Sequence, residues 1–398
     1  MAVRANKPAF NIREKLKELT SKFGLKGTEL ARAETAQDAR DLVSAGRKNI
    51  IINGDMRIAQ RGTSTQVVAN TAYYTCDRFA FFQGLSLTDA TVTGTQQTVT
   101  DLPGHTKSFR VTNVGNSAIT STSDGWIKYN AEDKDFDQVN WLNGSNKSVT
   151  LSFWAKSNRT GQFSVTLNAG TFSAAKNIKT YTLDSADTWK KIEVTYQDPS
   201  TWGNSGSTGA RIYWPMATGS TYYNTTPDAG WIYSSNHFGT VGDTQIHGDD
   251  GAYFEITGVQ LEVGKNATDF EYRSYGEELA LCQRYYYRHA TGTTGAGGAQ
   301  PICNALYYSA ANAFGVVTFP TTMRDIPELD QNSAVTGFQI LRAGGNEDIV
   351  TFNVQERSNA AFTIECSGLS GTIGHAAWFR TTSDSVASVP YLGFSAEI

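Results

Sequence analysis

Alternation of apolar and polar residues recurs along most of this chain and restricts what it can fold into. In "SVTLSFWAK", Leu151 and Phe153 alternate with polar neighbours, and "GQFSVTL" and "KKIEVTY" repeat the pattern. A period of two is typical of a strand with one buried face. In "YFEITGVQLEV" the apolar parity changes across Thr257 and Gly258, which predicts a β-bulge at the glycine. Turn-rich segments separate these stretches, so residues 49–273 are expected to form a jelly-roll β-sandwich and the protein to be mainly all-β.

A short helix is expected after this sandwich. Ser274 and Glu277 have the spacing of a capping box, so "YGEELALCQRYYYRH" is predicted to start as a helix. The glycine-rich "ATGTTGAGGAQP" cannot continue it and completes a helix-and-linker region over residues 274–300. Alternation then resumes in "FGVVTF", "AFTIEC" and "YLGFSAEI". Residues 301–398 are therefore expected to form a second, smaller β domain.

The first 48 residues differ from the rest in charge and pattern. They hold eleven Lys and Arg against six Asp and Glu, although the whole chain has a net charge of −4. Asn11 and Glu14 again have capping-box spacing, and "ELARAETAQDARDLV" predicts a second helix. Two short, polar helices have too little apolar surface for a core of their own. We expect residues 1–48 to be a helical arm that docks on a larger assembly.

Composition excludes several other classes. The acidic net charge gives no reason to expect a nucleic-acid partner. The start of the chain lacks the apolar core of a secretory signal, and no apolar run is long enough to cross a membrane, so a chain made in a cytosol without membrane insertion is expected. The cysteines are widely spaced and predict buried free thiols rather than a zinc site: Cys76, Cys282, Cys303 and Cys366.

Several motifs resemble one family when taken in order. "NIIINGDMRIAQRGTS", "DRF", "VTLSFWAKS", "TWKKIEVTY" and "EITGVQLEVGKNATDFEYRSYGEELALCQRYYYRH" are similar to the carbohydrate-binding-module-like jelly-roll domain of tailed-bacteriophage tail fibres. "TFPTTMRDIP" and the terminal "YLGFSAEI" resemble the receptor-binding tip that follows it. The N-terminal arm looks like the attachment segment of fibres from phages of marine cyanobacteria.

The resemblance implies a homotrimeric virion protein of the phage tail, made in the host cytoplasm, whose arm docks on a tail or adaptor protein and which binds a host surface glycan. Two alternatives stay open: a head fibre or capsid decoration protein, and a glycan-depolymerising tailspike. The C-terminal domain would then be outermost.

One helical face cannot hold three consecutive tyrosines, because neighbouring residues point about 100° apart. In a trimer, Tyr285, Tyr286 and Tyr287 are expected to pack against the jelly roll, the tip and a neighbouring chain.

No catalytic residue and no cofactor is predicted. "DKDFDQVNWLNG" starts like an EF-hand loop but lacks its glycine and final glutamate. Asp249, Asp250 and Glu255 would be the ligands of a structural calcium, although a polar turn is the preferred interpretation. Glycoside cleavage needs two carboxyl groups about 5–10 Å apart across a sugar. Glu255 and Glu262 are both expected to point outward into solvent, and no pair is placed across a cleft.

Glycan-binding residues are sought among aromatic side chains with polar neighbours. Sugar C–H faces pack on aromatic rings, and sugar hydroxyls need planar polar partners, usually on loops held by a rigid scaffold. Two loops of the jelly roll and the strand-connecting loops of the tip have this composition. The alternative interpretation is that several of these rings belong to the core or pack on hairpins, because the sandwich is rich in aromatic residues. The predicted ligand-binding residues are Trp202, Tyr222, Tyr223, Trp231, Trp378 and Arg380.

Overall fold

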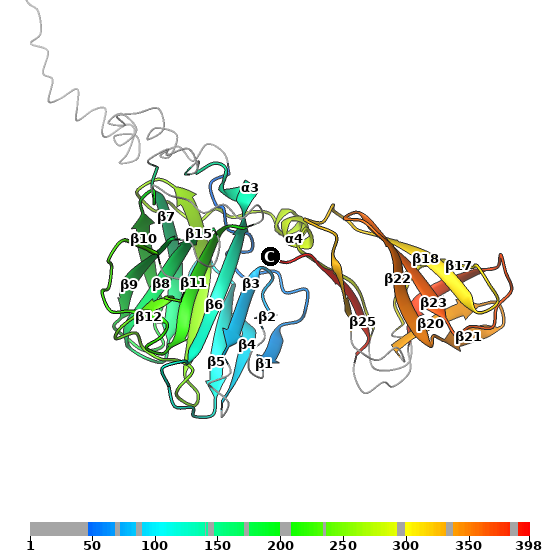
Figure 1. The fold of residues 1–398 in the computed structure, drawn as a ribbon, viewed down its shortest axis with the longest axis horizontal. Coiled ribbons are helices and arrows are strands. Elements are labelled where there is room, and N and C mark those ends of the chain that lie inside the picture. Colours follow the sequence, from blue (N-terminus) through cyan, green and yellow to red (C-terminus); the bar gives the residue numbers. More distant parts are fainter. Residues whose placement is uncertain are drawn as a thin grey trace, which may run out of the picture.

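The computed structural model describes eleven stretches of the chain. These are residues 47–67, 72–84, 90–139, 141, 147–170, 175–199, 208–233, 236–292, 299–331, 337–382 and 389–398. The arm predicted over residues 1–48 lies outside them, except for Arg47 and Lys48. Two β units lie side by side, with a short helix and the end of the chain between them (Figure 1). The mainly all-β fold class is confirmed.

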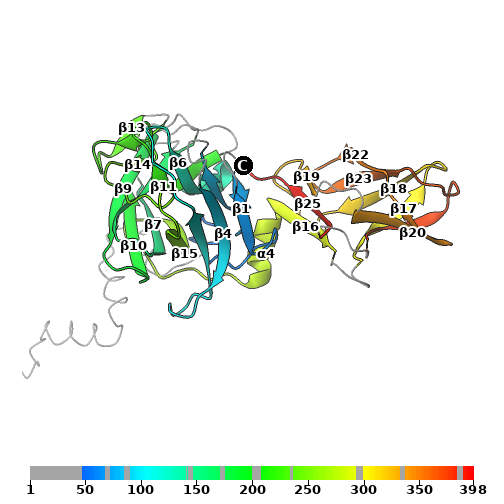
Figure 2. The ribbon, with the colours of Figure 1, turned by 90° about the horizontal axis from the view of Figure 1, so that it is seen from below.

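The first unit is a sandwich of two antiparallel sheets, which lie as two layers in Figure 2. We call the six-stranded layer sheet I; in spatial order it contains β1 (Ser64–Val67), β4 (Thr91–Thr98), β5 (Lys107–Val114), β15 (Tyr253–Val263), β7 (Val149–Ser157) and β10 (Lys190–Tyr196). We call the seven-stranded layer sheet II; it contains β13 (Trp231–Tyr233), β9 (Ala175–Leu183), β8 (Gly161–Ala169), β11 (Thr208–Thr218), β6 (Asp124–Glu132), β3 (Phe79–Gln83) and β2 (Tyr73–Tyr74).

The core of this sandwich follows from the alternation along its strands. Phe153 of β7 and Trp214 of β11 come from opposite sheets, and their rings meet edge to face with centroids 5.6 Å apart. Burying each such ring contributes roughly 1.5–3 kcal/mol. The predicted bulge in β15 is confirmed: its register against β7 shifts between Thr257 and Gln260, and Gly258 has a φ of 61°. The bulge keeps Ile256 and Leu261 in the same core.

Two smaller features extend the first unit. A parallel pair of two-residue strands, β12 (Tyr223–Asn224) and β14 (Gly239–Thr240), lies beside β8 and β11. A single-turn helix, α3 (Asp133–Phe136), follows β6, and Phe136 is buried in the core. Within the described part of the chain, neither helix has the length and apolar character that spanning a bilayer requires.

The second unit packs a seven-stranded sheet against a three-stranded one. The larger, sheet III, contains β21 (Gly345–Asp348), β20 (Phe338–Arg342), β24 (Ala376–Thr381), β17 (Pro301–Tyr307), β18 (Asn312–Thr318), β23 (Ala361–Ser367) and β22 (Thr351–Arg357). The smaller, sheet IV, contains β16 (Tyr286–Thr291), β25 (Tyr391–Ser395) and β19 (Glu328–Gln331). Phe362 of sheet III and Phe394 of sheet IV meet at 5.1 Å in the core between them.

The predicted helix is confirmed but is shorter than expected. It is α4 (Tyr275–Gln283), and the Ser274 side chain accepts a hydrogen bond from the backbone N–H of Glu277, as the capping-box spacing predicts. Its extension through the tyrosines was wrong, because Tyr286 and Tyr287 start β16, which pairs with β25. Pairing with a strand about a hundred residues later in the chain overrides the local helical pattern. Consecutive side chains of a strand point to opposite sides, so Tyr286 and Tyr287 can pack on two different surfaces.

The first two of the three tyrosines contact the two units, as expected for the jelly roll and the tip. Tyr285 and Tyr286 are fully buried within this one chain. Tyr285 packs with Ile52, Ile58 and Cys282 in a small cluster between the two units. The Tyr286 hydroxyl donates to the Asp330 carboxylate at 2.8 Å, and the Arg61 guanidinium lies 3.4 Å from the centre of its ring. These two side chains are thus occupied by contacts inside the chain and do not need a neighbouring one.

Candidate functional site

The outward side of sheet II collects aromatic and cationic side chains from four neighbouring strands. In β6, "DGWIKYNAE", Ile127, Tyr129 and Ala131 face the core, so Trp126 and Lys128 point outward. In β11, "TGARIYWPMAT", the same alternation turns Arg211 outward. Figure 1 shows β6, β8, β9 and β11 side by side. We call this outward side of sheet II the outer face.

Strand register arranges the central part of the outer face in three rows. Residues directly opposite each other on adjacent strands have Cβ atoms about 4.5–5.5 Å apart. The first row runs Asn130, Arg211, Asn168 and Lys176 across β6, β11, β8 and β9. The second row runs Ala80, Lys128, Tyr213, Thr166 and Ile178, and the third runs Phe82, Trp126 and Pro215. None of these twelve residues is an Asp or a Glu.

The aromatic rings of the outer face form a connected series. Phe82 and Trp126 stack with centroids 4.8 Å apart and planes inclined by 15°. Trp126 meets Tyr213 edge to face at 5.6 Å, and Tyr213 lies 5.0 Å from Phe238. The series ends at Tyr222, 6.1 Å from Phe238. Trp126 and Tyr222 are half-buried, so part of each ring is accessible from solvent.

The segment carrying β12 and β14 holds the last two rings in place. The backbone N–H of Phe238 donates to the Tyr222 carbonyl at 2.8 Å, and the Thr166 hydroxyl donates to the Phe238 carbonyl. Because these bonds tie the segment to β8, Tyr222 and Phe238 are fixed relative to the sheet. The ring platform is therefore rigid before any ligand arrives, which reduces the entropy lost on binding.

Cations lie directly on these rings. The Lys128 ammonium is 5.0 Å from the centre of the Trp126 ring, and the Lys176 ammonium is 4.6 Å from the centre of Phe238. Burial, with the Arg211 charge adding to it, lowers the pKa of Lys128 to about 8 and that of Lys176 to about 7. Burial together with the Lys176 charge also lowers the pKa of His237. The positive groups of the outer face thus destabilise one another's charged forms.

Some polar atoms of the outer face have no protein partner. Asn168 is 0% exposed, and neither its amide nitrogen nor its amide oxygen has a hydrogen-bond partner within the described residues. The same holds, in that part of the chain, for Nε of Arg211 and Nδ1 of His237. An unsatisfied buried polar group costs about 1–3 kcal/mol of stability, so such a group in a native fold needs a reason.

The predicted ligand-binding residues are distributed over different parts of the structure. Tyr222 lies at the edge of the outer face, with Tyr223 next to it in β12. Trp231 lies in β13 and packs on the sandwich core: its ring meets Trp141 at 5.9 Å, and its Nε1–H donates to the Gln197 carbonyl. Trp202 lies outside the described residues.

Trp378 and Arg380 lie on a strand of the second unit. Both are in β24, on the outward side of sheet III, rather than in the connecting loops where they were expected. Trp378 is 60% exposed and lies opposite Asn304 and Leu341. Arg380 donates to the Asn346 side-chain oxygen at 2.7 Å. An exposed ring beside amides and a guanidinium is a second surface of the composition that suits a sugar.

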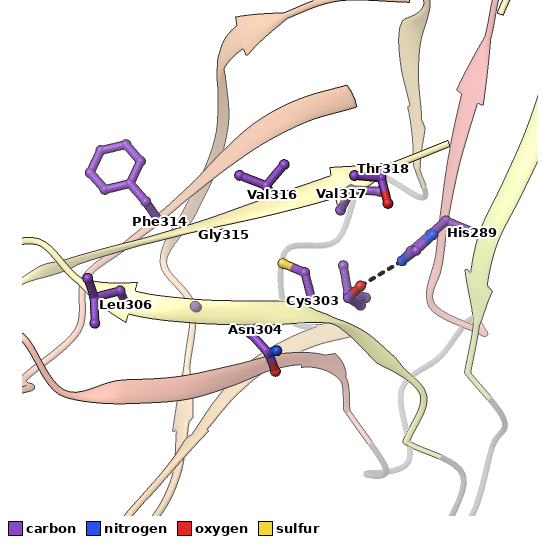
Figure 3. A pocket seen from close by; sticks show the side chains of 11 residues that line it. His289, Cys303, Asn304, Leu306, Phe314, Gly315, Val316, Val317 and Thr318 are labelled. Carbon is purple, nitrogen blue, oxygen red and sulfur yellow. Dashed lines mark hydrogen bonds between the residues drawn. The ribbon is translucent and has the colours of Figure 1, made fainter. Parts of the chain in front are cut away.

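A pocket of about 580 Å³ opens where β17 and β18 diverge. Figure 3 shows Cys303 between the two strands and His289 at one end, where its Nε2 is 2.7 Å from the Ile302 carbonyl oxygen. Most of the lining is apolar, and burial raises the pKa of the Cys303 thiol to about 12, so the reactive thiolate is not formed at neutral pH. The pocket therefore offers no connected series of stacked rings and no activated nucleophile.

The expectation that Glu255 and Glu262 point into solvent was wrong. They are 1% and 3% exposed. Glu255 pairs with Arg110 at 2.7 Å and lies 3.8 Å from Lys156, and Glu262 accepts two hydrogen bonds from Thr268. Alternation along β15 correctly places Glu255 and Glu262 on the side of the sheet away from the core. That side is covered, however, by Arg110 and Lys156 over Glu255 and by the segment around Thr268 over Glu262.

The proposed calcium ligands have different partners. Asp249 lies 3.3 Å from Arg159, and Asp250 accepts a hydrogen bond from the backbone N–H of Gly115 at 2.8 Å. Glu255 is held by Arg110, as described above. Within the described residues, no group of three or more His, Cys, Asp or Glu side chains is arranged to hold a metal ion.

Sequence reasoning missed the central residues of the outer face, namely Trp126, Lys128 and Arg211. A signal was present: in "DGWIKYNAE" and "TGARIYWPMAT" one parity is apolar and the other carries Trp, Lys, Asn, Arg and Tyr. Arg211, Asn168 and Lys176 lie opposite one another because β11, β8 and β9 are neighbours in the sheet. Local alternation in the sequence does not predict which strands are neighbours.

Comparison with known proteins does not assign a family. No protein-family model matches the chain, and no curated protein matches it. Among solved structures, it is similar at 12% identity to the enzymatically active domain of tailspike protein 4 of bacteriophage CBA120, over 54% of this chain and 21% of the tailspike chain, with a TM-score of 0.26. A putative sugar binding protein from Bacteroides thetaiotaomicron gives 12% identity over 54% and 100% of the two chains and a TM-score of 0.29. A family 11 carbohydrate-binding module from Clostridium thermocellum gives 12% identity over 52% and 98%, with a TM-score of 0.26. These values are too low to assign a family or a function.

Proposed function

We propose that this chain is a bacteriophage tail fibre subunit that attaches to the virion through its N-terminal arm and binds a host surface glycan without cleaving it. The virion role is supported by the sequence resemblance to tail fibres. Glycan binding is supported by one structural observation: a fixed platform of aromatic rings with planar polar and cationic groups beside it on the outer face.

The chemistry of the outer face matches what a sugar presents. The C–H face of a pyranose ring packs on an exposed indole face, and the half-buried Trp126 leaves part of its ring accessible for that contact. Arg211 and Asn168 supply a guanidinium and an amide two rows away, and Lys128 lies in the row between. Such planar donors recognise vicinal hydroxyls or acid groups with paired hydrogen bonds.

Weak single sites would suffice in a fibre. A millimolar site corresponds to only about 4 kcal/mol of binding free energy. In the homotrimer that the resemblance implies, three linked sites raise the effective concentration on a surface that carries many copies of the glycan. The proposed activity therefore needs neither a deep pocket nor a pair of catalytic carboxyl groups.

The test is binding to immobilised bacterial surface polysaccharides, using the full chain. Trp126→Ala is expected to weaken binding about tenfold, or about 1.4 kcal/mol, whereas Tyr275→Ala is the matched control, because Tyr275 is exposed on α4 away from sheet II. Reducing ends released into solution are measured in the same samples. Equal losses for the two variants would contradict the site, and a steady rise in reducing ends would contradict binding without cleavage.

The virion role has a separate test. Antibody-gold labelling of intact particles should place the chain on the tail. Label on the capsid would instead support the head fibre or decoration protein.

A further inference from the structure

The cations of the outer face are close together. Arg211 lies opposite Asn168, and Asn168 lies opposite Lys176, so three adjacent strands contribute one continuous polar row. Lys128 lies opposite Tyr213, two residues along β11 from Arg211, which makes Lys128 and Arg211 diagonal neighbours. Diagonal positions are about 7–8 Å apart and within reach of long side chains. Positive charge from β6, β11 and β9 therefore converges on one patch of the sheet.

Two of these cations lack a carboxylate partner. Within the described residues, no Asp or Glu lies at salt-bridge distance from Lys128 or Arg211. The Glu397 carboxylate acts on Lys128 from further away, but it is paired with Arg78 and Arg61. The Ile398 backbone oxygen at that end of the row accepts from the Asn130 amide. In a chain with 38 acidic and 34 basic residues, two neighbouring cations without a carboxylate partner are unexpected.

The buried amide beside them is a second and independent observation. Asn168 is fully buried between the Arg211 and Lys176 positions, with both of its amide atoms unsatisfied within the described structure. A structural amide at this depth would normally be hydrogen-bonded. Oxygen atoms of a ligand that reached this position would satisfy the Asn168 amide.

Electrostatics gives the sign of the missing partner. Burial, with the Arg211 charge adding to it, lowers the pKa of both Lys128 and Lys176. The charged groups that face them are Arg211, His237 and, more distantly, Arg78 and Glu397. Binding of an anion would offset the repulsion between these positive groups. A neutral ligand would instead remove water from the charged side chains without supplying an opposite charge.

We propose that the outer face binds an acidic glycan, with Trp126 stacking on a sugar ring while Lys128 and Arg211 contact its carboxylate or sulfate group. This rests on the proposed glycan-binding function and specifies its ligand. The anionic group is the shared chemistry of uronic acid polymers and sulfated polymers. The net charge of −4 means that such binding would have to come from this patch rather than from general attraction.

The test measures affinity of the full chain for three soluble probes at about 0.15 M salt, where charges more than about 8 Å apart are screened. The probes are oligoalginate, which carries carboxylates, dextran sulfate, and neutral dextran. We expect at least one acidic probe to bind about tenfold or more tighter than dextran. The acidic probe that binds identifies the group.

The variants assign the effect to the patch. Lys128→Gln combined with Arg211→Gln should weaken binding of the acidic probe about tenfold or more. Lys190→Gln combined with Lys191→Gln removes the same charge from β10 in sheet I and should have little effect. Arg211→Lys keeps the charge but loses the paired hydrogen bonds, so it should weaken binding less than Arg211→Gln does. Melting temperatures of all variants are measured alongside, and Lys128→Gln alone is the reserve if the double variant does not fold.

Three results would overturn the inference. Equal affinity for dextran and the acidic probes would leave glycan binding in place but remove the acidic specificity. Equal losses for the two double variants would show non-specific attraction. Failure to bind any of these probes, together with failure to bind every immobilised bacterial polysaccharide, would overturn both the inference and the proposed function.

Discussion

The Arg78 guanidinium, buried in the first unit, pairs with the Glu397 carboxylate just beyond the last strand of the second unit. Arg78 is 2% exposed and also lies 3.5 Å from the centre of the Tyr285 ring. Arg61 lies 3.4 Å from the same carboxylate, and Arg324 donates to the Ala396 carbonyl at 2.9 Å. The end of the described chain thus returns to the first unit and fixes the two sandwiches to each other.

Glu397→Gln is therefore expected to destabilise the whole chain. It leaves the Arg78 charge buried without its partner, and breaking a buried pair in this way costs about 3–5 kcal/mol. Thermal unfolding followed by circular dichroism measures the effect, and Glu356→Gln, on the exposed strand β22, is the matched control. An unchanged melting temperature for Glu397→Gln would show that the junction carries little stability.

This junction also affects how recognition can be mapped. Truncation after residue 290 would remove Glu397 and Ile398 together with the second unit and expose Arg78 and Tyr285. Loss of binding in such a truncated chain would not distinguish a missing site from a damaged first unit. Point variants on each outward surface are the sharper comparison.

Trp378→Ala is expected to reduce adsorption to cells more than binding of a free oligosaccharide. Its exposed ring can add a weak contact, and three linked chains would multiply a small loss per site. We expect less than about a twofold change for the oligosaccharide and several-fold for cells. Adsorption assays and calorimetry on the same preparations measure the two effects. If Trp378→Ala abolishes oligosaccharide binding and Trp126→Ala does not, recognition lies in the second unit.

Tyr286→Ser is expected to weaken folding rather than assembly. The side chain is fully buried, donates to Asp330 and stacks under Arg61, so its removal should cost about 3–5 kcal/mol. Urea unfolding measures stability, and light scattering of the folded fraction measures stoichiometry. Tyr275→Ser, at an exposed position, is the control. Dissociation of an oligomer with unchanged unfolding would contradict this assignment.

His247 should make the first unit sensitive to acid. It is fully buried against Gly125, neither ring nitrogen has a hydrogen-bond partner within the described residues, and burial lowers its pKa to about 3. Between about pH 6.5 and pH 3 the unfolded chain binds a proton that the folded chain does not, so stability falls as pH falls.

The His247 contribution is expected to reach about 2–3 kcal/mol by about pH 4.5. His247→Leu, which cannot titrate, should show a correspondingly flatter dependence of unfolding free energy on pH. The comparison isolates His247 from Asp77 and Asp124, whose pKa values burial raises to about 6 and whose effect on stability has the opposite sign. Parallel pH profiles for the two proteins would contradict the prediction.

Deleting residues 1–46 is expected to leave a folded protein that no longer joins virions. The deletion ends at residue 46 because Lys48 and Asn49 belong to the first unit: the Lys48 backbone N–H donates to Glu271 and the Asn49 amide donates to the Val259 carbonyl. Circular dichroism tests folding, and immunoblots of purified particles test incorporation. Normal incorporation of the shortened chain would contradict the attachment role.

The features that sequence predicted are those set by local pattern. Alternation located the strands, the parity change at Gly258 located the bulge, and Ser274 with Glu277 located the start of α4. The end of that helix depends on β25, which is distant in sequence, so local pattern could not supply it. The burial of Glu255 depends in the same way on Arg110 and Lys156 from two other strands. The outer face was missed because its rows form only once strand order is known.

A crystal structure of the full chain with a bound acidic oligosaccharide tests the central claim most directly. We expect a sugar ring stacked on Trp126, with its acid group at hydrogen-bond distance from Lys128 or Arg211 and its oxygens near the Asn168 amide. An oligosaccharide bound at Trp378 or elsewhere, with the outer face of sheet II empty, would contradict the account.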